Sequence, residues 1–155
     1  MKSSDANKKL SQIDSAINEI TSFSSVSVSE QSYLAKFLVV FISGIYEESI
    51  ETIINEMVGK LEKKEISNFI EESIRYGFRN PEIKNIKKLL GKFKNDQWEK
   101  EIDALPKETK DAIDSICANK NALAHGNLVT ITLGEVLEYY HKSRPVIEKI
   151  DDILL

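Results

Sequence analysis

The sequence has 155 residues, of which 41% are hydrophobic and 30% are charged, a balance typical of one globular domain that buries its own core. The formal net charge of −4 excludes a surface that is basic throughout, so any contact with a nucleic acid would need a local basic patch. The single cysteine, Cys117, excludes an internal disulfide and is typical of a protein in the reducing cytoplasm.

The N-terminal part of the chain combines a polar segment with a first helix. Residues 1–9 are polar and lack the apolar stretch of a signal peptide, and we expect them to be disordered. From Leu10 to Ile20 apolar residues recur at intervals of three and four, which predicts an amphipathic helix. A single helical domain is therefore predicted over residues 10–155, in a protein of the cytoplasm.

The second predicted helix is the longest and spans roughly Val28 to Lys60. Ser27 and Glu30 form a capping-box pattern at its start. Its first part is apolar nearly all round, so we expect this helix to be buried on most sides as the central element. The longest apolar run, residues 37–42, is far too short to span a membrane.

Two weaker patterns follow in the middle of the chain. The charged segment 61–76 carries a thin apolar stripe and is predicted to be helical. Asn80-Pro81-Glu82 has the order of cap, first-turn proline and early acid, which predicts a helix that starts with Asn80 as its cap. A basic stretch from Arg75 to Lys94 is either a solvated helix face or a docking surface for a phosphate backbone.

The last two predicted helices have clear start and stop signals. Pro106 opens one helix and Gly126 ends it. Thr132 and Glu135 form a second capping box, from which the last helix runs to about Ile150. Alternation of apolar and polar residues is nearly absent, so the sequence predicts an all-α protein, a single bundle of about five main helices.

One segment, Lys120-Asn121-Ala122-Leu123-Ala124-His125-Gly126, has residues that indicate chemistry. Residues four apart in a helix share a face, so Asn121 and His125 are predicted to lie together, with Lys120 displaced to one side but able to swing toward them. Histidine is suited to proton transfer because its ordinary pKa, about 6.5, lies near neutral pH. The alternative is that Asn121 and His125 simply finish a helix.

This segment resembles the R-N-x-x-A-H-G signature of the HEPN superfamily, with Lys120 in place of the family's arginine. The resemblance covers about Ile20 to Leu155. It includes the long central helix with its segment 41–48, the helix start at 79–81 and the helix over 133–140. The chain is most similar to the branch named RiboL-PSP-HEPN, which is found among bacterial toxin and antiviral-defence genes.

The resemblance implies a metal-independent RNA endonuclease with a composite site at the interface of a homodimer. In such a site the RNA 2′-hydroxyl attacks the adjacent phosphorus and leaves a cyclic phosphate. His125 would move the protons, Lys120 would neutralise charge on the phosphoryl oxygens, and Asn121 would orient the ring or the phosphate. No cofactor and no metal ion are expected. The expected partners are RNA, a second copy of the chain, and a cognate antitoxin or defence-system protein, without a membrane.

Two points stay open at this stage. Lysine offers a point charge where arginine would hold two phosphate oxygens, so Lys120 is compatible with a weaker nuclease and with a non-catalytic module that binds RNA or a partner protein. Glu48, on the central helix, is a secondary site candidate, because some HEPN proteins place an acid near the motif from this helix. It could hold Lys120, order His125 or face solvent.

Overall fold

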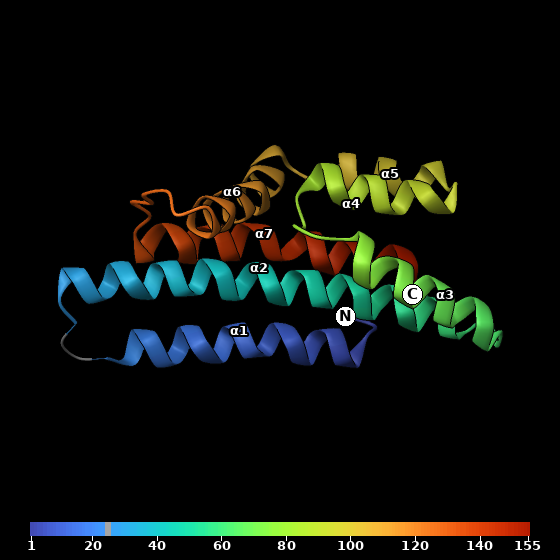
Figure 1. The fold of residues 1–155 in the computed structure, drawn as a ribbon, viewed down its shortest axis with the longest axis horizontal. Helices are drawn as coiled ribbons and strands as arrows, with labels where there is room; N and C mark the ends of the chain where they lie inside the picture. Colours follow the sequence, from blue (N-terminus) through green and yellow to red (C-terminus); the bar gives the residue numbers. More distant parts are fainter. Residues whose placement is uncertain (24–25) are drawn as a thin grey trace.

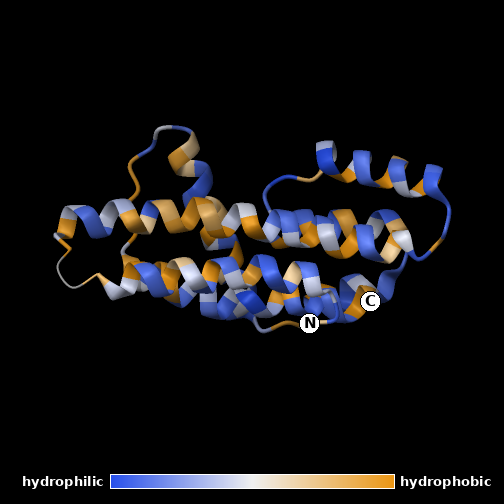
Figure 2. Cartoon of the chain, turned by 90° about the horizontal axis from the view of Figure 1, so that it is seen from below, coloured by the Kyte–Doolittle hydropathy of each residue, from blue (hydrophilic) through white to orange (hydrophobic). Residues whose placement is uncertain are grey.

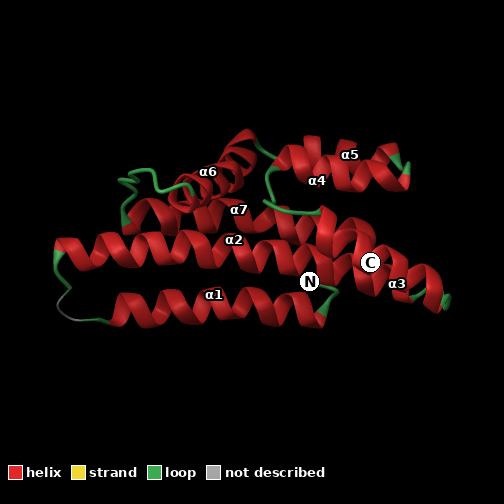
Figure 3. Ribbon diagram, in the orientation of Figure 1, coloured by secondary structure: helices red, strands yellow, loops and turns green. Residues whose placement is uncertain are grey.

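The structure is a computed structural model that describes residues 1–23 and 26–155, and within these residues it contains helices and no strand (Figure 3). The predicted all-α class is confirmed, but the count of about five helices is wrong. The middle of the chain divides into short pieces, which gives seven α-helices and one short 3-10 helix. They are α1 (Ser4–Ser22), α2 (Val28–Gly59), α3 (Lys64–Gly77), α4 (Ile83–Leu90), η1 (Gly91–Phe93), α5 (Asp96–Asp103), α6 (Lys107–Ala124) and α7 (Leu133–Leu154).

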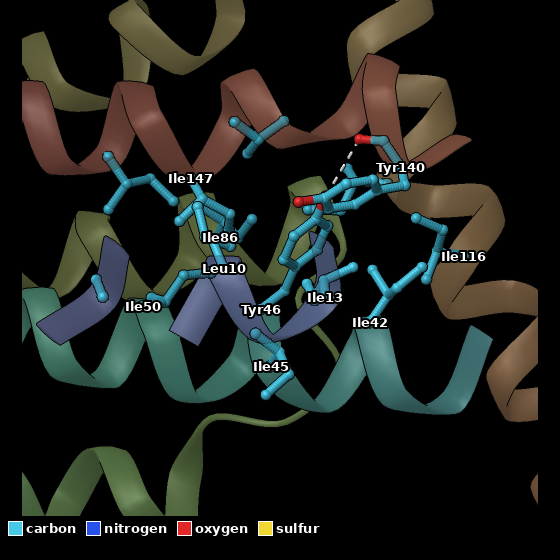
Figure 4. Packing of buried hydrophobic residues seen from close by; sticks show 14 of the residues in the cluster. Leu10, Ile13, Ile42, Ile45, Tyr46, Ile50, Ile86, Ile116, Tyr140 and Ile147 are labelled. Carbon is cyan, nitrogen blue, oxygen red and sulfur yellow. Dashed lines mark hydrogen bonds between the residues drawn. The ribbon is translucent and has the colours of Figure 1, made fainter. Parts of the chain in front are cut away.

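The central position of α2 is confirmed. Figure 1 shows α1, α2 and α7 running side by side, with α6 crossing above them and α3 against the far end of α2. The core between these helices is built around two buried tyrosines, Tyr46 of α2 and Tyr140 of α7, whose rings lie 6.4 Å apart (Figure 4). The Tyr46 hydroxyl lies 2.8 Å from the hydroxyl of Ser143, so this polar group is not left without a partner inside the core.

The burial of α2 is less complete than its composition predicts. Leu38 is fully buried, but Phe37 and Val40 are 52% and 48% exposed, and Tyr33 is 70% exposed. Helices α1, α6 and α7 pack against other sides of α2. No described element covers the side that carries Tyr33, Phe37 and Val40. An apolar side of α2 is therefore left in solvent, next to the end of α6.

Local start and stop signals are confirmed at most helix ends. Both capping boxes form, with Ser27 accepting from the backbone of Glu30 and Thr132 from that of Glu135. The start of α4 was predicted wrongly: Asn80 is not its cap, because α4 begins at Ile83 and Asn80 adopts a left-handed conformation with φ 55°. Within the described part of the chain, no helix combines the length and apolarity needed to cross a membrane.

The prediction of a disordered segment over residues 1–9 is wrong. Helix α1 begins at Ser4, and the side chain of Ser3 caps it by accepting from the backbone N–H of Ala6 at 3.0 Å. Asp151, which is buried in α7, accepts hydrogen bonds from the backbone N–H groups of Lys2 and Ser3. The polar N-terminal residues are ordered because a carboxylate at the other end of the chain satisfies their donors.

We expect Asp151→Ala to lower the free energy of unfolding by about 2–3 kcal/mol, because it removes a charged acceptor and leaves two backbone donors unpaired. The matched control is Asp152→Ala. Asp152 is exposed and pairs with Lys2 at 3.4 Å, and its removal should change stability by less than about 0.5 kcal/mol. Urea unfolding followed by circular dichroism measures both, and equal effects of the two variants would show that the N-terminus is not held by Asp151.

Candidate functional site

The last turn of α6 ends in a tight C-terminal cap. The N–H of Asn127 donates to the carbonyl of Ala122 at 2.9 Å and the N–H of Gly126 to that of Leu123 at 3.1 Å, which is the hydrogen-bond pattern of a Schellman motif. Gly126 has φ 73°, a conformation that glycine adopts without steric cost. The helix therefore ends at Ala124, with His125 as its C-cap and Gly126 directly after it as the stop that the sequence predicts.

Lys120 is held by a segment that precedes it by 40 residues. Its ammonium donates to the side-chain oxygen of Asn80 at 2.8 Å, in a half-buried position. This partner is a neutral amide, and Lys120 forms no ion pair with any residue in the described ranges. The side chain is thus oriented while its positive charge stays available to an anion.

Asn80 is fixed in turn by helix α2. Its backbone N–H donates to Glu47 at 3.0 Å, and the guanidinium of Arg79 donates to the same carboxylate at 3.1 Å. Asparagine is among the few residues that tolerate the left-handed φ seen here. One carboxylate on α2 therefore sets the position of the 79–80 segment, and this segment positions Lys120.

Asn121 contacts Glu82, which lies two positions after Asn80 in the sequence. Its side-chain amide donates to Glu82 at 3.4 Å, a long hydrogen bond, and Glu82 also pairs with Lys84 at 2.8 Å. Next to this contact the backbone N–H of Ile83 donates to Asp114 of α6 at 2.8 Å, and partial burial raises the pKa of Asp114. The start of α4 is thereby fastened to the face of α6 that carries the motif.

His125 lies at the end of α6 with its side chain exposed. Its backbone N–H donates to the carbonyl of Asn121 at 3.1 Å, while its ring makes no hydrogen bond to a residue that the structure describes. Of the three predicted site residues, Lys120 and Asn121 both contact the 80–82 segment and His125 stands beside them without such a contact. Among the described residues of one chain, no group orients the imidazole by a hydrogen bond.

Glu48, the secondary candidate, does not reach the motif. Its carboxylate pairs with Lys9 of α1 at 2.8 Å, on another side of α2. Adjacent residues of a helix point about 100° apart, so the acid on the motif side is Glu47. Sequence reasoning missed Glu47, Asn80 and Glu82. One signal in the sequence could have identified Glu47. Positions 40, 44, 47 and 51 of α2 follow the three- and four-residue spacing of one helix face, so the exposed apolar side of α2 continues into Glu47.

The buried thiol of Cys117 lies one turn before Lys120. Desolvation raises the pKa of Cys117 to about 12, although the nearby Ser43 hydroxyl on α2 lowers it in part. At neutral pH this group is therefore a thiol and not a thiolate, and it has no means to act as a nucleophile. Among the described residues there is no cluster of three or more His, Cys, Asp or Glu side chains placed to hold a metal ion.

The arrangement can bind an anion and move a proton. An unneutralised ammonium and a side-chain amide sit on one turn of α6, and an accessible imidazole follows within that helix end. The carbonyl dipoles at a helix C-terminus oppose an anion, so the charge of Lys120 is needed to offset them.

The chain was compared with families of known proteins, with curated proteins and with solved structures. A family model described as RiboL-PSP-HEPN matches residues 2–155 of the chain. No curated protein and no solved structure matches it. The matched residues include every helix of the fold and the whole of the α6 motif.

Proposed function

Because the chain belongs to the RiboL-PSP-HEPN family, which points to an RNA-related function, we propose that it is a metal-independent RNA endonuclease. The observation that carries this proposal is that Lys120 is bound by a neutral amide and forms no ion pair with a described residue. A neutral amide at 2.8 Å orients its ammonium at the end of α6, five residues before an accessible histidine. A site that holds its cation without a carboxylate is suited to a phosphate group.

In the proposed reaction the 2′-hydroxyl of RNA attacks the neighbouring phosphorus as His125 takes its proton. The bond from phosphorus to the 5′-oxygen breaks, and that oxygen receives a proton from a second histidine or from water. The products are a 2′,3′-cyclic phosphate and a 5′-hydroxyl. Lys120 neutralises the charge that builds on the non-bridging oxygens, and Asn121 donates a hydrogen bond to the phosphate.

The exposed imidazole supports a composite site in a homodimer. In the described part of a single chain, no residue forms a hydrogen bond with the His125 ring, and the second histidine of the sequence, His141, lies on α7. Two copies that bring their α6 ends together would supply two histidines and two lysines to one pocket. One histidine would then act as the base and the other as the acid.

The exposed side of α2 supports the same assembly. We call Tyr33, Phe37, Val40 and Gly44 the α2 stripe; they follow the heptad spacing of helix–helix interfaces and all are exposed. A Cβ at Gly44 would meet no atom within 4 Å, so this position of the stripe is open to close approach by a second copy. In Figure 2 the end of α6 projects beside this half of α2, so a dimer through the α2 stripe would place two motifs near each other.

The test is incubation of the purified protein with total RNA in EDTA. We expect cleavage to persist in the chelator, and we expect the fragments to carry cyclic phosphates, which block ligation at the 3′ end until they are removed by acid and phosphatase treatment. Loss of cleavage in EDTA with recovery on adding Mg²⁺ would contradict the proposal, as would fragments with 3′-hydroxyl ends.

The second candidate is a non-catalytic HEPN module that binds RNA or a partner protein. It is favoured by Glu82, whose carboxylate contacts Asn121 and places a negative charge beside the phosphate position. It is also compatible with Lys120, because a lysine cannot form the two-point contact that arginine makes with a phosphate. In that case His125 is a remnant of an ancestral site.

Substitution of Lys120 separates the two candidates. For the nuclease we expect Lys120→Arg to raise cleavage several-fold, because the guanidinium can hold two phosphate oxygens at once. Lys120→Ala should lower it by about 10²-fold, since one charge contact to the reacting phosphoryl group is lost. Cleavage rates on a fluorescent RNA measure both, and rates that change in neither variant would make Lys120 a spectator.

We propose that such a nuclease acts as a toxin or as a component of antiviral defence. Expression of the wild-type chain should then slow the growth of bacterial cells, and His125→Ala should remove this effect at equal protein levels. A cognate antitoxin or defence-system protein would be the partner that restrains it.

A further inference from the structure

In the basic stretch between Arg75 and Lys94, some lysines form ion pairs with carboxylates and others form none with a described residue. On α4, Lys84 pairs with Glu82 at 2.8 Å and Lys87 pairs with Asp103 at 2.7 Å. Lys88 and Lys92 form no ion pair with a residue in the described ranges, and both line a polar hollow of about 180 Å³ between α3 and α4. These two lysines are one helical turn apart, so their side chains point to the same side.

This hollow continues into an apolar groove. The two share Leu89 and Lys92, and the groove has a volume of about 360 Å³. Its walls include Phe69 of α3, which is 73% exposed, and the half-buried Phe93 of η1. The rings of Phe69 and Phe93 thus line the same groove as Lys92, which forms no ion pair with a described residue.

The groove leads to the motif. Arg79 lines the hollow, and the next residue, Asn80, binds the ammonium of Lys120 at 2.8 Å. Asn85 of α4 fastens this connection by donating to the carbonyl of Asn80 at 2.9 Å. Figure 2 shows α3 and the end of α6 on the same side of α2, at different points along its length.

We propose that this groove between α3 and α4 binds the single-stranded RNA that flanks the cleaved phosphate, with phosphates at Lys88 and Lys92 and a base against Phe69. Grooves for single strands combine cations that follow the backbone with aromatic rings on which bases stack. This combination is what the groove contains, on a protein whose net charge of −4 would otherwise repel RNA. The assignment rests on the proposed RNA-related function and not on catalysis.

The test is the affinity of a labelled, unstructured oligouridylate for the full chain carrying His125→Ala, in EDTA, so that no cleavage is needed. We expect Lys88→Gln/Lys92→Gln to weaken binding about 10-fold and to reduce the slope of log K against log salt by about 1.4, because each contact to a single-strand phosphate contributes about 0.7. The control, Lys60→Gln/Lys64→Gln, makes the same charge change at exposed lysines that do not line the groove, and should leave the slope unchanged.

Phe69 tests the aromatic part of the same assignment. Phe69→Ala should weaken binding about 10-fold, and Phe69→Leu should restore little, because an aliphatic side chain fills the groove but does not stack on a base. Unchanged RNA affinity in the lysine and phenylalanine variants would overturn the assignment. An acidic helix of a partner protein would then be the alternative occupant of the groove. If the wild type binds RNA through the groove but never cleaves it, the nuclease proposal fails and the groove stands.

Discussion

His125→Ala is expected to reduce RNA cleavage by about 10³-fold while leaving the helical content of the protein unchanged. Removal of a general acid or base costs about 10²–10⁴ in rate, and His125 is the group at the end of α6 whose ordinary pKa suits proton transfer at neutral pH. Because its ring makes no hydrogen bond within the described part of the chain, the substitution removes no contact that stabilises the fold. Single-turnover cleavage of a labelled RNA measures the effect.

The matched control is the other histidine. His141 is exposed on α7, and His141→Ala should cleave RNA at the wild-type rate. Cleavage by His125→Ala at the wild-type rate would remove the nuclease proposal and leave the non-catalytic module. Equal losses in both variants would point to a general loss of structure, which circular dichroism detects.

Charges on the α2 stripe are expected to produce a monomer that does not cleave RNA. Phe37→Glu/Val40→Glu puts two carboxylates into the proposed dimer interface, and each copy would face the same two charges of the other across the two-fold axis. Unpaired charges in a desolvated interface cost several kcal/mol, which is enough to dissociate a micromolar dimer. Light scattering gives the mass in solution, and the RNA assay gives the loss of activity.

Leu61→Glu/Ile66→Glu is the control for the stripe. These residues are 57% and 49% exposed, close to the exposure of Phe37 and Val40, but they lie at and after the far end of α2. The control should stay dimeric and active. A wild-type chain that is monomeric at micromolar concentration and still cleaves RNA would show that one copy contains the whole site, and the composite arrangement would be wrong.

The sequence by itself determined the features that depend on neighbouring residues. Ser27 with Glu30 and Thr132 with Glu135 set helix starts, because the donor and acceptor of a capping box lie three positions apart. Gly126 set the stop of α6, because glycine adopts the left-handed φ of 73° that the cap requires. The same local reasoning placed the motif on one helix end and gave the all-α class.

The tertiary structure decided everything that depends on which distant residues meet. The order of the N-terminus comes from Asp151, whose hydrogen bond to Ser3 spans 148 positions of the chain, and no local pattern contains that partner. The same is true of Asn80, which binds Lys120 across 40 positions. Glu47 and Glu48 are indistinguishable by composition, and the 100° turn between them sends one toward the motif and the other toward Lys9. The exposure of the α2 stripe was also settled by packing, because an apolar helix is buried only on the sides that other helices cover.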